Sequence, residues 1–184
     1  MPDYEKLVTN LTRRGYTVQR FPTARQAADY LDSVIDQTSV AFGGSVTLDQ
    51  MGLYDRLAAH NNVIWHWKTE DKLTARYQAM TTDMYITSVN GLAETGELIN
   101  IDGIGNRVAA TLFGHKKVWF VVGRNKLAPT YDEAQKRPKA SKKDPLCHQG
   151  GPLLRLQEPG PHLPGAGGSL GSRHKHGNGG RPHR

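Results

Sequence analysis

Residues 84–123 read MYITSVNGLAETGELINIDGIGNRVAATLFGHKKVWFVVG, and this stretch decides the fold. Its apolar pattern predicts five elements in order: a strand at 84–89, short β segments at 91–94 and 97–101, a helix at 106–113 and a strand at 117–122. The first and last of these strands show little polar alternation, which indicates burial on both faces. Two buried strands joined through a helix predict a parallel pair.

The rest of the chain up to about residue 136 has the same alternation of elements. Strands are predicted at 16–21, 39–42 and 63–65, and helices at 3–14, 23–35, 48–60, 69–80 and from 130 onward. Apolar strands separated by amphipathic helices favour an α/β fold, with a mainly parallel sheet covered by helices. We therefore predict one α/β domain over residues 1–136.

The remaining segment, 137–184, differs in composition. From Pro138 onward there is no Ile, Val, Phe, Tyr, Trp or Met, whereas ten of the twenty glycines and seven of the ten prolines fall there. Such a segment buries too little apolar surface to offset its chain entropy, so we predict a disordered Gly/Pro/His-rich tail. From Pro138 onward it also holds eight basic and two acidic residues, which leaves residues 1–137 near neutral although the whole chain carries +7.

This distribution of charge bears on function. A near-neutral domain gives no support for a specific nucleic-acid surface, and any such binding would come from the tail and be non-specific. Cys147 is the single cysteine, so no disulfide can form within the chain. No apolar run is long enough for a membrane span, and the first residues lack a signal-peptide pattern. We expect a cytoplasmic protein.

Three loops follow predicted strands at the carboxyl edge of the sheet, where α/β proteins place their sites. The first loop has two glycines that allow close backbone approach, and two hydroxyl side chains that suit an anion. An ordinary tight turn, with Thr47 capping the next helix, explains the same residues. The candidate ligand-binding residues here are Gly43, Gly44, Ser45 and Thr47.

The second loop, 87–107, is the longest polar insertion. Glu94, Glu97 and Asp102 are candidate catalytic carboxylates, as a general base or nucleophile. Exposed hairpin carboxylates that only face water are the alternative for the two glutamates. The glycines of the stretch 102–107 precede a helix, and Arg107 is placed to bind an anion in bidentate fashion. The candidate ligand-binding residues here are Asn90, Gly103, Gly105, Asn106 and Arg107.

The third loop follows the most apolar strand and contains two cations and an amide. These groups suit an anionic ligand, and a solvated basic turn explains them equally well. Its candidate ligand-binding residues are Gly123, Arg124, Asn125 and Lys126. The histidines of the domain, by contrast, lack metal-ligand spacing, and we predict no metal site.

These loops together resemble the lactate-utilization (LUD) domain family. The matching text is FGGSVTL at 42–48, GELINIDGIGNRVAA at 96–110 and VVGRNK at 121–126, in order and with family-like spacing. The resemblance implies a fold like that of the sugar-phosphate isomerase and CoA-transferase superfamily. It also implies a role as an accessory component of L-lactate oxidation, beside iron–sulfur partner proteins.

The chain departs from the family after about Lys136. Relatives carry a C-terminal cysteine cluster suited to an iron–sulfur centre, whereas this chain has Cys147 alone, so we expect no cofactor in it. A frameshift in the gene is our hypothesis for this C-terminus, and a natural disordered tail is the alternative. Two functions remain open: an accessory protein that binds a small anion or a protein partner, and a stand-alone isomerase or acyl/CoA-transferase-like enzyme.

Overall fold

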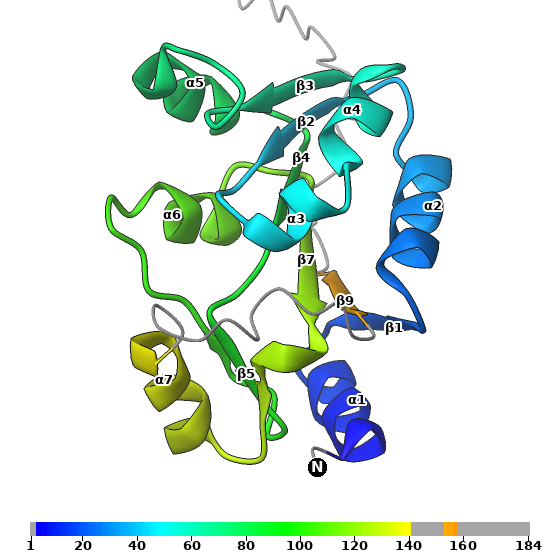
Figure 1. The fold of residues 1–184 in the computed structure, drawn as a ribbon, viewed down its shortest axis with the longest axis vertical. Helices are drawn as coiled ribbons and strands as arrows, with labels where there is room; N and C mark the ends of the chain where they lie inside the picture. Colours follow the sequence, from blue (N-terminus) through cyan, green and yellow to red (C-terminus); the bar gives the residue numbers. More distant parts are fainter. Residues whose placement is uncertain (1–2, 141–152, 158–184) are drawn as a thin grey trace, which may run out of the picture.

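The computed structural model describes residues 3–140 and 153–157. Their main sheet has six strands in the order β1-β9-β7-β4-β2-β3 (Figure 1). The strands are β1 (Thr17–Phe21), β2 (Ser39–Phe42), β3 (Asn62–Trp65), β4 (Met84–Thr87), β7 (Lys117–Gly123) and β9 (Leu153–Gln157). β7, β4, β2 and β3 pair in parallel, and β9 is antiparallel to both β1 and β7. The predicted α/β fold with a mainly parallel sheet is therefore confirmed.

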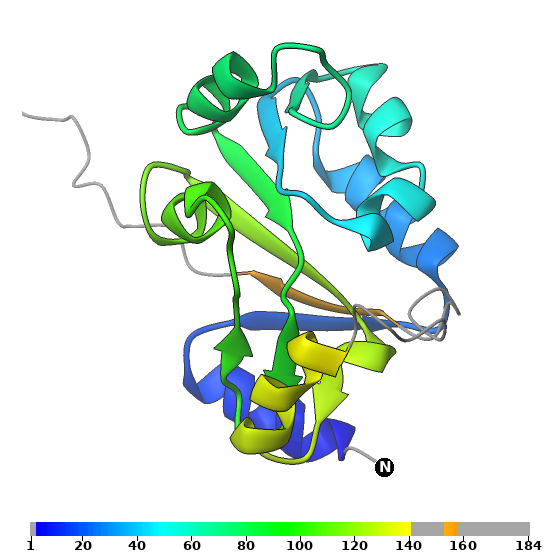
Figure 2. The same ribbon diagram turned by 60° about the vertical axis from the view of Figure 1, so that its left-hand side comes forward.

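Helices cover both faces of this sheet (Figure 2). They are α1 (Tyr4–Arg13), α2 (Ala24–Val34), α3 (Val46–Gln50), α4 (Leu53–Ala58), α5 (Lys72–Ala79), α6 (Asn106–Leu112) and α7 (Tyr131–Ala140). Alternate residues of each strand enter two separate cores, because successive side chains point to opposite faces. Tyr85 packs with residues of α1, α5 and α6, whereas Ile86 packs with residues of α2, α3 and α4.

Local sequence signals fix several helix starts. Asp3 caps α1 by accepting hydrogen bonds from the backbone N–H groups of Glu5 and Lys6, and Thr23 caps α2 in the same way. Leu7 and Leu11, one turn apart on α1, are fully buried. The spacing of apolar residues thus gives each helix one buried face.

A second, smaller sheet continues from the carboxyl ends of β4 and β7. It has the order β6-β5-β8 and consists of β5 (Gly91–Ala93), β6 (Leu98–Ile99) and β8 (Leu127–Ala128). β5 and β6 form the predicted antiparallel hairpin, and β8 pairs with β5 after the 3-10 helix η1 (Arg124–Lys126). α7 packs on β5, so this sheet has a helical cover of its own.

The structure differs from the sequence predictions in two places. The single helix expected at 48–60 is two helices, α3 and α4, because Gly52 adopts a left-handed conformation (φ 60°) between them. The tail expected to be disordered from residue 137 instead contributes the end of α7 and strand β9 to the fold. Cys147 and the rest of the tail lie outside the described residues. Within the described part, no helix is long and apolar enough to cross a membrane.

His60 links α2 to the end of α4 and gives the fold a pH dependence. Its ring nitrogens lie 3.0 Å from an oxygen of Asp32 and 2.9 Å from one of Asp36. Hydrogen bonding to Asp32 and then to Asp36 raises the pKa of His60 above its ordinary value. We expect the contribution of His60 to the free energy of unfolding to be full below pH 6.5, the unfolded-state value, and to fall as pH rises through the folded-state pKa.

Denaturant unfolding at several pH values between about 6 and 8.5 checks this expectation. The unfolding free energy of the His60→Asn variant should fall less steeply with pH than that of the unmodified protein. His115 serves as the control, because burial lowers its pKa and its contribution therefore has the opposite sign. Identical slopes for His60→Asn and the unmodified protein would contradict the assignment.

Candidate functional site

The three predicted loops start at the same edge of the sheet, because β2, β4 and β7 are parallel and end there. The backbone N–H of Gly43, just after β2, donates to the carbonyl oxygen of Ile86 at 2.9 Å. Lys126, just after β7, donates from Nζ to Oγ of Ser88 at 2.7 Å. Both the first and the third loop therefore meet the end of β4, where the second loop begins.

The two glycines of the first loop are explained by the protein's own side chains. A Cβ on Gly43 would lie against Oγ1 of Thr87 and 2.9 Å from the Tyr85 hydroxyl oxygen, and a Cβ on Gly44 would lie 3.1 Å from the indole of Trp67. Ser45 is buried and caps α3, accepting from the N–H of Leu48. The first loop is therefore closely packed against these side chains, and the residue that caps α3 is Ser45, where the sequence suggested Thr47.

The second loop holds Arg107 in a defined position. Nη2 of Arg107 donates to Oδ1 of Asn90 at 2.6 Å and to the carbonyl oxygen of Ile101 at 2.8 Å. The same Asn90 oxygen accepts from the N–H of Ile101 at 2.9 Å. These acceptors are neutral, and within the described ranges no carboxylate forms an ion pair with Arg107. The guanidinium is thus fixed in place by neutral oxygens and has no carboxylate partner among the described residues.

Asp102 has a clear structural role. One of its oxygens accepts from the N–H groups of Arg107 at 2.8 Å and Val108 at 3.1 Å, in the first turn of α6. Burial acts to raise the pKa of Asp102, but hydrogen bonds from backbone N–H groups, first from Val108 and Ile104, outweigh it and the pKa lies below its ordinary value. Asp102 is therefore an ionised helix cap, and Gly105 supplies the left-handed residue (φ 90°) that starts the helix.

The side chains on the α5/α6 face of β4 meet this loop. Tyr85 and Thr87 are 1% and 0% exposed, and Tyr85 interacts electrostatically with both Arg107 and Asp102. Burial raises the pKa of Tyr85, so its hydroxyl stays neutral and can donate a hydrogen bond. We call this group the rim cluster; its members are Gly43, Tyr85, Thr87, Asn90, Asp102 and Arg107.

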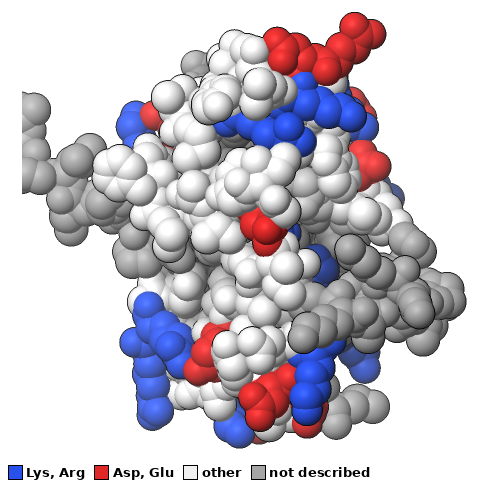
Figure 3. All heavy atoms as spheres, turned by 90° about the vertical axis from the view of Figure 1, so that its left-hand side faces the viewer, with Lys and Arg blue, Asp and Glu red and all other residues white. Residues whose placement is uncertain are grey.

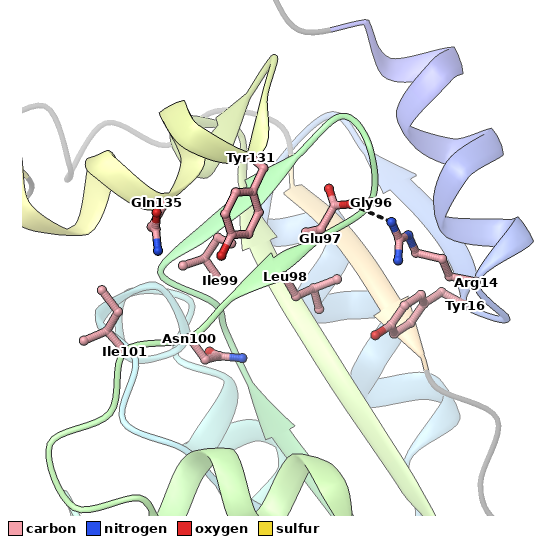
Figure 4. A pocket seen from close by; sticks show the side chains of 10 residues that line it. All are labelled: Arg14, Tyr16, Gly96, Glu97, Leu98, Ile99, Asn100, Ile101, Tyr131 and Gln135. Carbon is pink, nitrogen blue, oxygen red and sulfur yellow. Dashed lines mark hydrogen bonds and ion pairs between the residues drawn. The ribbon is translucent and has the colours of Figure 1, made fainter.

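The other two candidate carboxylates contact α1. Glu94 is buried; its Oε1 accepts from the N–H of Asp3 at 2.7 Å, and its Oε2 lies 3.5 Å from Nζ of Lys6. Glu97 pairs with Arg14 at 2.6 Å, on the wall of a groove of about 690 Å³ that runs along β6 (Figure 4). Both glutamates hold the small sheet against α1, whereas Asp102 caps α6.

The remaining candidate residues lie in the loop before α6, at the start of α6 and around η1. Gly103 is exposed and has open space around its Cα, and Asn106 is the first residue of α6. Arg124 is exposed and Asn125 half-buried in η1, one residue past Gly123. Sequence reasoning missed Tyr85, Thr87 and Ser88. The sequence indicated the positions of Tyr85 and Thr87, because side chains alternate along a strand. Both therefore lie on one face of β4, at the edge where the loops begin.

The fold and the rim cluster define a class: an α/β protein with a cationic group held at the carboxyl edge of a parallel sheet. The model of the LUD domain family matches residues 4–149 of this chain. The chain therefore belongs to the LUD domain family and is a lactate-utilization-related protein. A search of curated proteins found no match.

Proposed function

We propose that this protein binds a small anionic ligand at the rim cluster and serves as an accessory component of L-lactate oxidation. The observation that supports this proposal is the position of the Arg107 guanidinium, which donates to two neutral oxygens at 2.6 and 2.8 Å. A cation without a carboxylate partner among the described residues, near the buried hydroxyl of Tyr85, suits a carboxylate or phosphate group.

Charge distribution supports an anion at this position. Nη2 of Arg107 gives its hydrogens to Asn90 and Ile101, so the donors left for a ligand are Nε and Nη1. The only carboxylate of the rim cluster, Asp102, has an oxygen committed to two backbone N–H groups of α6. The anion would thus meet Arg107 without displacing an internal ion pair.

The Arg107→Gln variant tests this proposal. We expect it to lower the affinity for L-lactate or for inorganic phosphate about tenfold, because a hydrogen bond to a charged group contributes roughly 1.5 kcal/mol or more. Isothermal titration calorimetry with each compound gives the measurement. Arg20→Gln is the matched control, since Arg20 pairs with the exposed Glu5 on the surface of β1. Equal affinities for the two variants would refute the assignment of Arg107.

The proposed accessory role rests on membership of the LUD family. The proposed partners of this protein are the iron–sulfur proteins of L-lactate oxidation. A partner that binds the folded state raises the melting temperature, by an amount that grows with the logarithm of its concentration relative to its Kd. Thermal melting of this protein with and without those proteins tests the association. An unchanged melting temperature, together with separate elution in gel filtration, would exclude it.

A further inference from the structure

A second set of polar groups without hydrogen-bond partners lies beside the rim cluster, on the α5 side. His66 is 7% exposed, and within the described ranges no hydrogen bond involves its ring nitrogens. Arg76 on α5 is half-buried, its Nε is enclosed without an acceptor, and no described carboxylate pairs with it. Nε of Arg76 is an enclosed donor without an acceptor, which costs free energy, and Arg76 interacts electrostatically with an imidazole that makes no hydrogen bond to the described residues. Both groups suit an acceptor that a ligand would supply.

Strand geometry puts His66 on the same face as the rim cluster. Trp65 packs in the core beneath α2–α4, whereas Ile64 packs in the core on the α5/α6 side. Side chains alternate along a strand, so His66, directly after Trp65, turns to the α5/α6 side. The register pairs Trp65 with Phe42, which places His66 beside Gly43 at the carboxyl edge.

The electrostatic interactions of His66 also place it on the α5/α6 side of the sheet. It interacts with Arg76 and Lys72 of α5, and with Asp102 of the loop before α6. His66 therefore lies between α5 and the loop that carries Arg107. Figure 3 faces this side of the molecule, and basic side chains gather across its upper part, where α5 lies.

We propose that His66 and Arg76 form a second contact point for the ligand that Arg107 binds, so that the ligand is a small carboxylate with a second oxygen function. The inference rests on the proposed function and deepens it. Arg107 takes the carboxylate, while the imidazole N–H of His66 and the guanidinium of Arg76 donate to a hydroxyl or to a second carboxylate.

The charged groups around His66 make the affinity for the ligand at this contact depend on pH. Burial, with the charges of Arg76 and Lys72, lowers the pKa of His66, and Asp102 acts in the opposite direction. Tyr85 of β4 stays neutral, and Trp67 packs its ring edge-on against the imidazole without charge. A ligand oxygen at the ring raises the pKa of His66, so binding takes up a proton and affinity increases as pH falls.

Calorimetry with propionate, L-lactate and malonate tests the second contact, because these compounds share a carboxylate and differ in the second oxygen function. We expect L-lactate or malonate to bind the unmodified protein about tenfold more tightly than propionate, as one charge-assisted hydrogen bond predicts. His66→Gln and Arg76→Gln should each reduce this advantage and leave propionate affinity unchanged. The increase in affinity between about pH 8 and 6 should disappear in His66→Gln.

His60→Gln is the matched control, since His60 contacts Asp32 and Asp36 and precedes β3 at the amino edge of the sheet, opposite the carboxyl edge where the rim cluster lies. The inference is overturned if neither L-lactate nor malonate exceeds propionate, or if their advantage survives in both variants. If the His66→Gln variant fails to fold, the same comparison is made with Arg76→Gln, because Arg76 is only half-buried. Arg107→Gln separates the two proposals: unchanged propionate affinity in this variant refutes the proposed function and the inference with it. Lowered propionate affinity, together with an L-lactate advantage that survives in both His66→Gln and Arg76→Gln, refutes the inference alone.

Discussion

Replacing Gly91 by alanine should lower the free energy of unfolding by about 3 kcal/mol, the upper end of the usual cost of overpacking. A Cβ at this position would press on the carbonyl oxygen of Ala134 and lie 3.2 Å from its carbonyl carbon. These atoms belong to the backbone of α7, and Ala134 is fully buried against the small sheet. A helix backbone cannot rotate away as a side chain can, so α7 must shift from β5.

Denaturant unfolding followed by circular dichroism measures this loss. Gly103→Ala is the matched control, because nothing lies within 4 Å of its Cβ position and its φ is not positive. The control should change the unfolding free energy by about 0.5 kcal/mol or less, as for surface substitutions in general. Equal unfolding midpoints for Gly91→Ala and Gly103→Ala would show that α7 does not pack on β5 as described.

The sequence predicted the main sheet well because its strands are continuous apolar runs. β4 and β7 fall within two residues of their expected bounds, and all parallel strands were found. The break between α3 and α4 was hidden, since Leu48, Leu53 and Leu57 are all buried and continue one apolar pattern across Gly52. β9 was missed because average composition over 137–184 concealed one leucine-rich segment, and its pairing with β1 and β7 is long-range.

Candidate site residues were predictable only where local sequence determines position. Arg107 follows a Gly-rich turn into a helix, a pattern that places a side chain near the sheet edge. The partners of Glu94, however, lie 91 residues earlier at the start of α1, and no local pattern reports such a contact. The spacing of the histidines bears only on a metal site, whereas the place of His66 directly after an apolar strand indicates the carboxyl edge of the sheet.

Gly43→Ala should cost about 2 kcal/mol of stability and also reduce ligand affinity, since it acts on the rim cluster itself. The new Cβ would lie 2.9 Å from Cβ of Thr87 and from the hydroxyl oxygen of Tyr85. Both side chains are at most 1% exposed, and Tyr85 stacks on His115 with ring centroids 5.0 Å apart. Neither side chain can turn toward solvent, so the strain must displace both, including the hydroxyl of Tyr85, which interacts electrostatically with Arg107.

Gly44→Ala supplies the matched comparison one residue further on. There the new Cβ would meet the indole of Trp67 at 3.1–3.2 Å, and Trp67 is 43% exposed, so the indole can move outward. We expect its stability loss to be less than half that of Gly43→Ala, with anion affinity retained. Measuring both variants by denaturant unfolding and by calorimetry with L-lactate separates packing from binding. If Gly44→Ala lost affinity as strongly as Gly43→Ala, the ligand would lie over the first loop, and the rim cluster at β4 would not be its site.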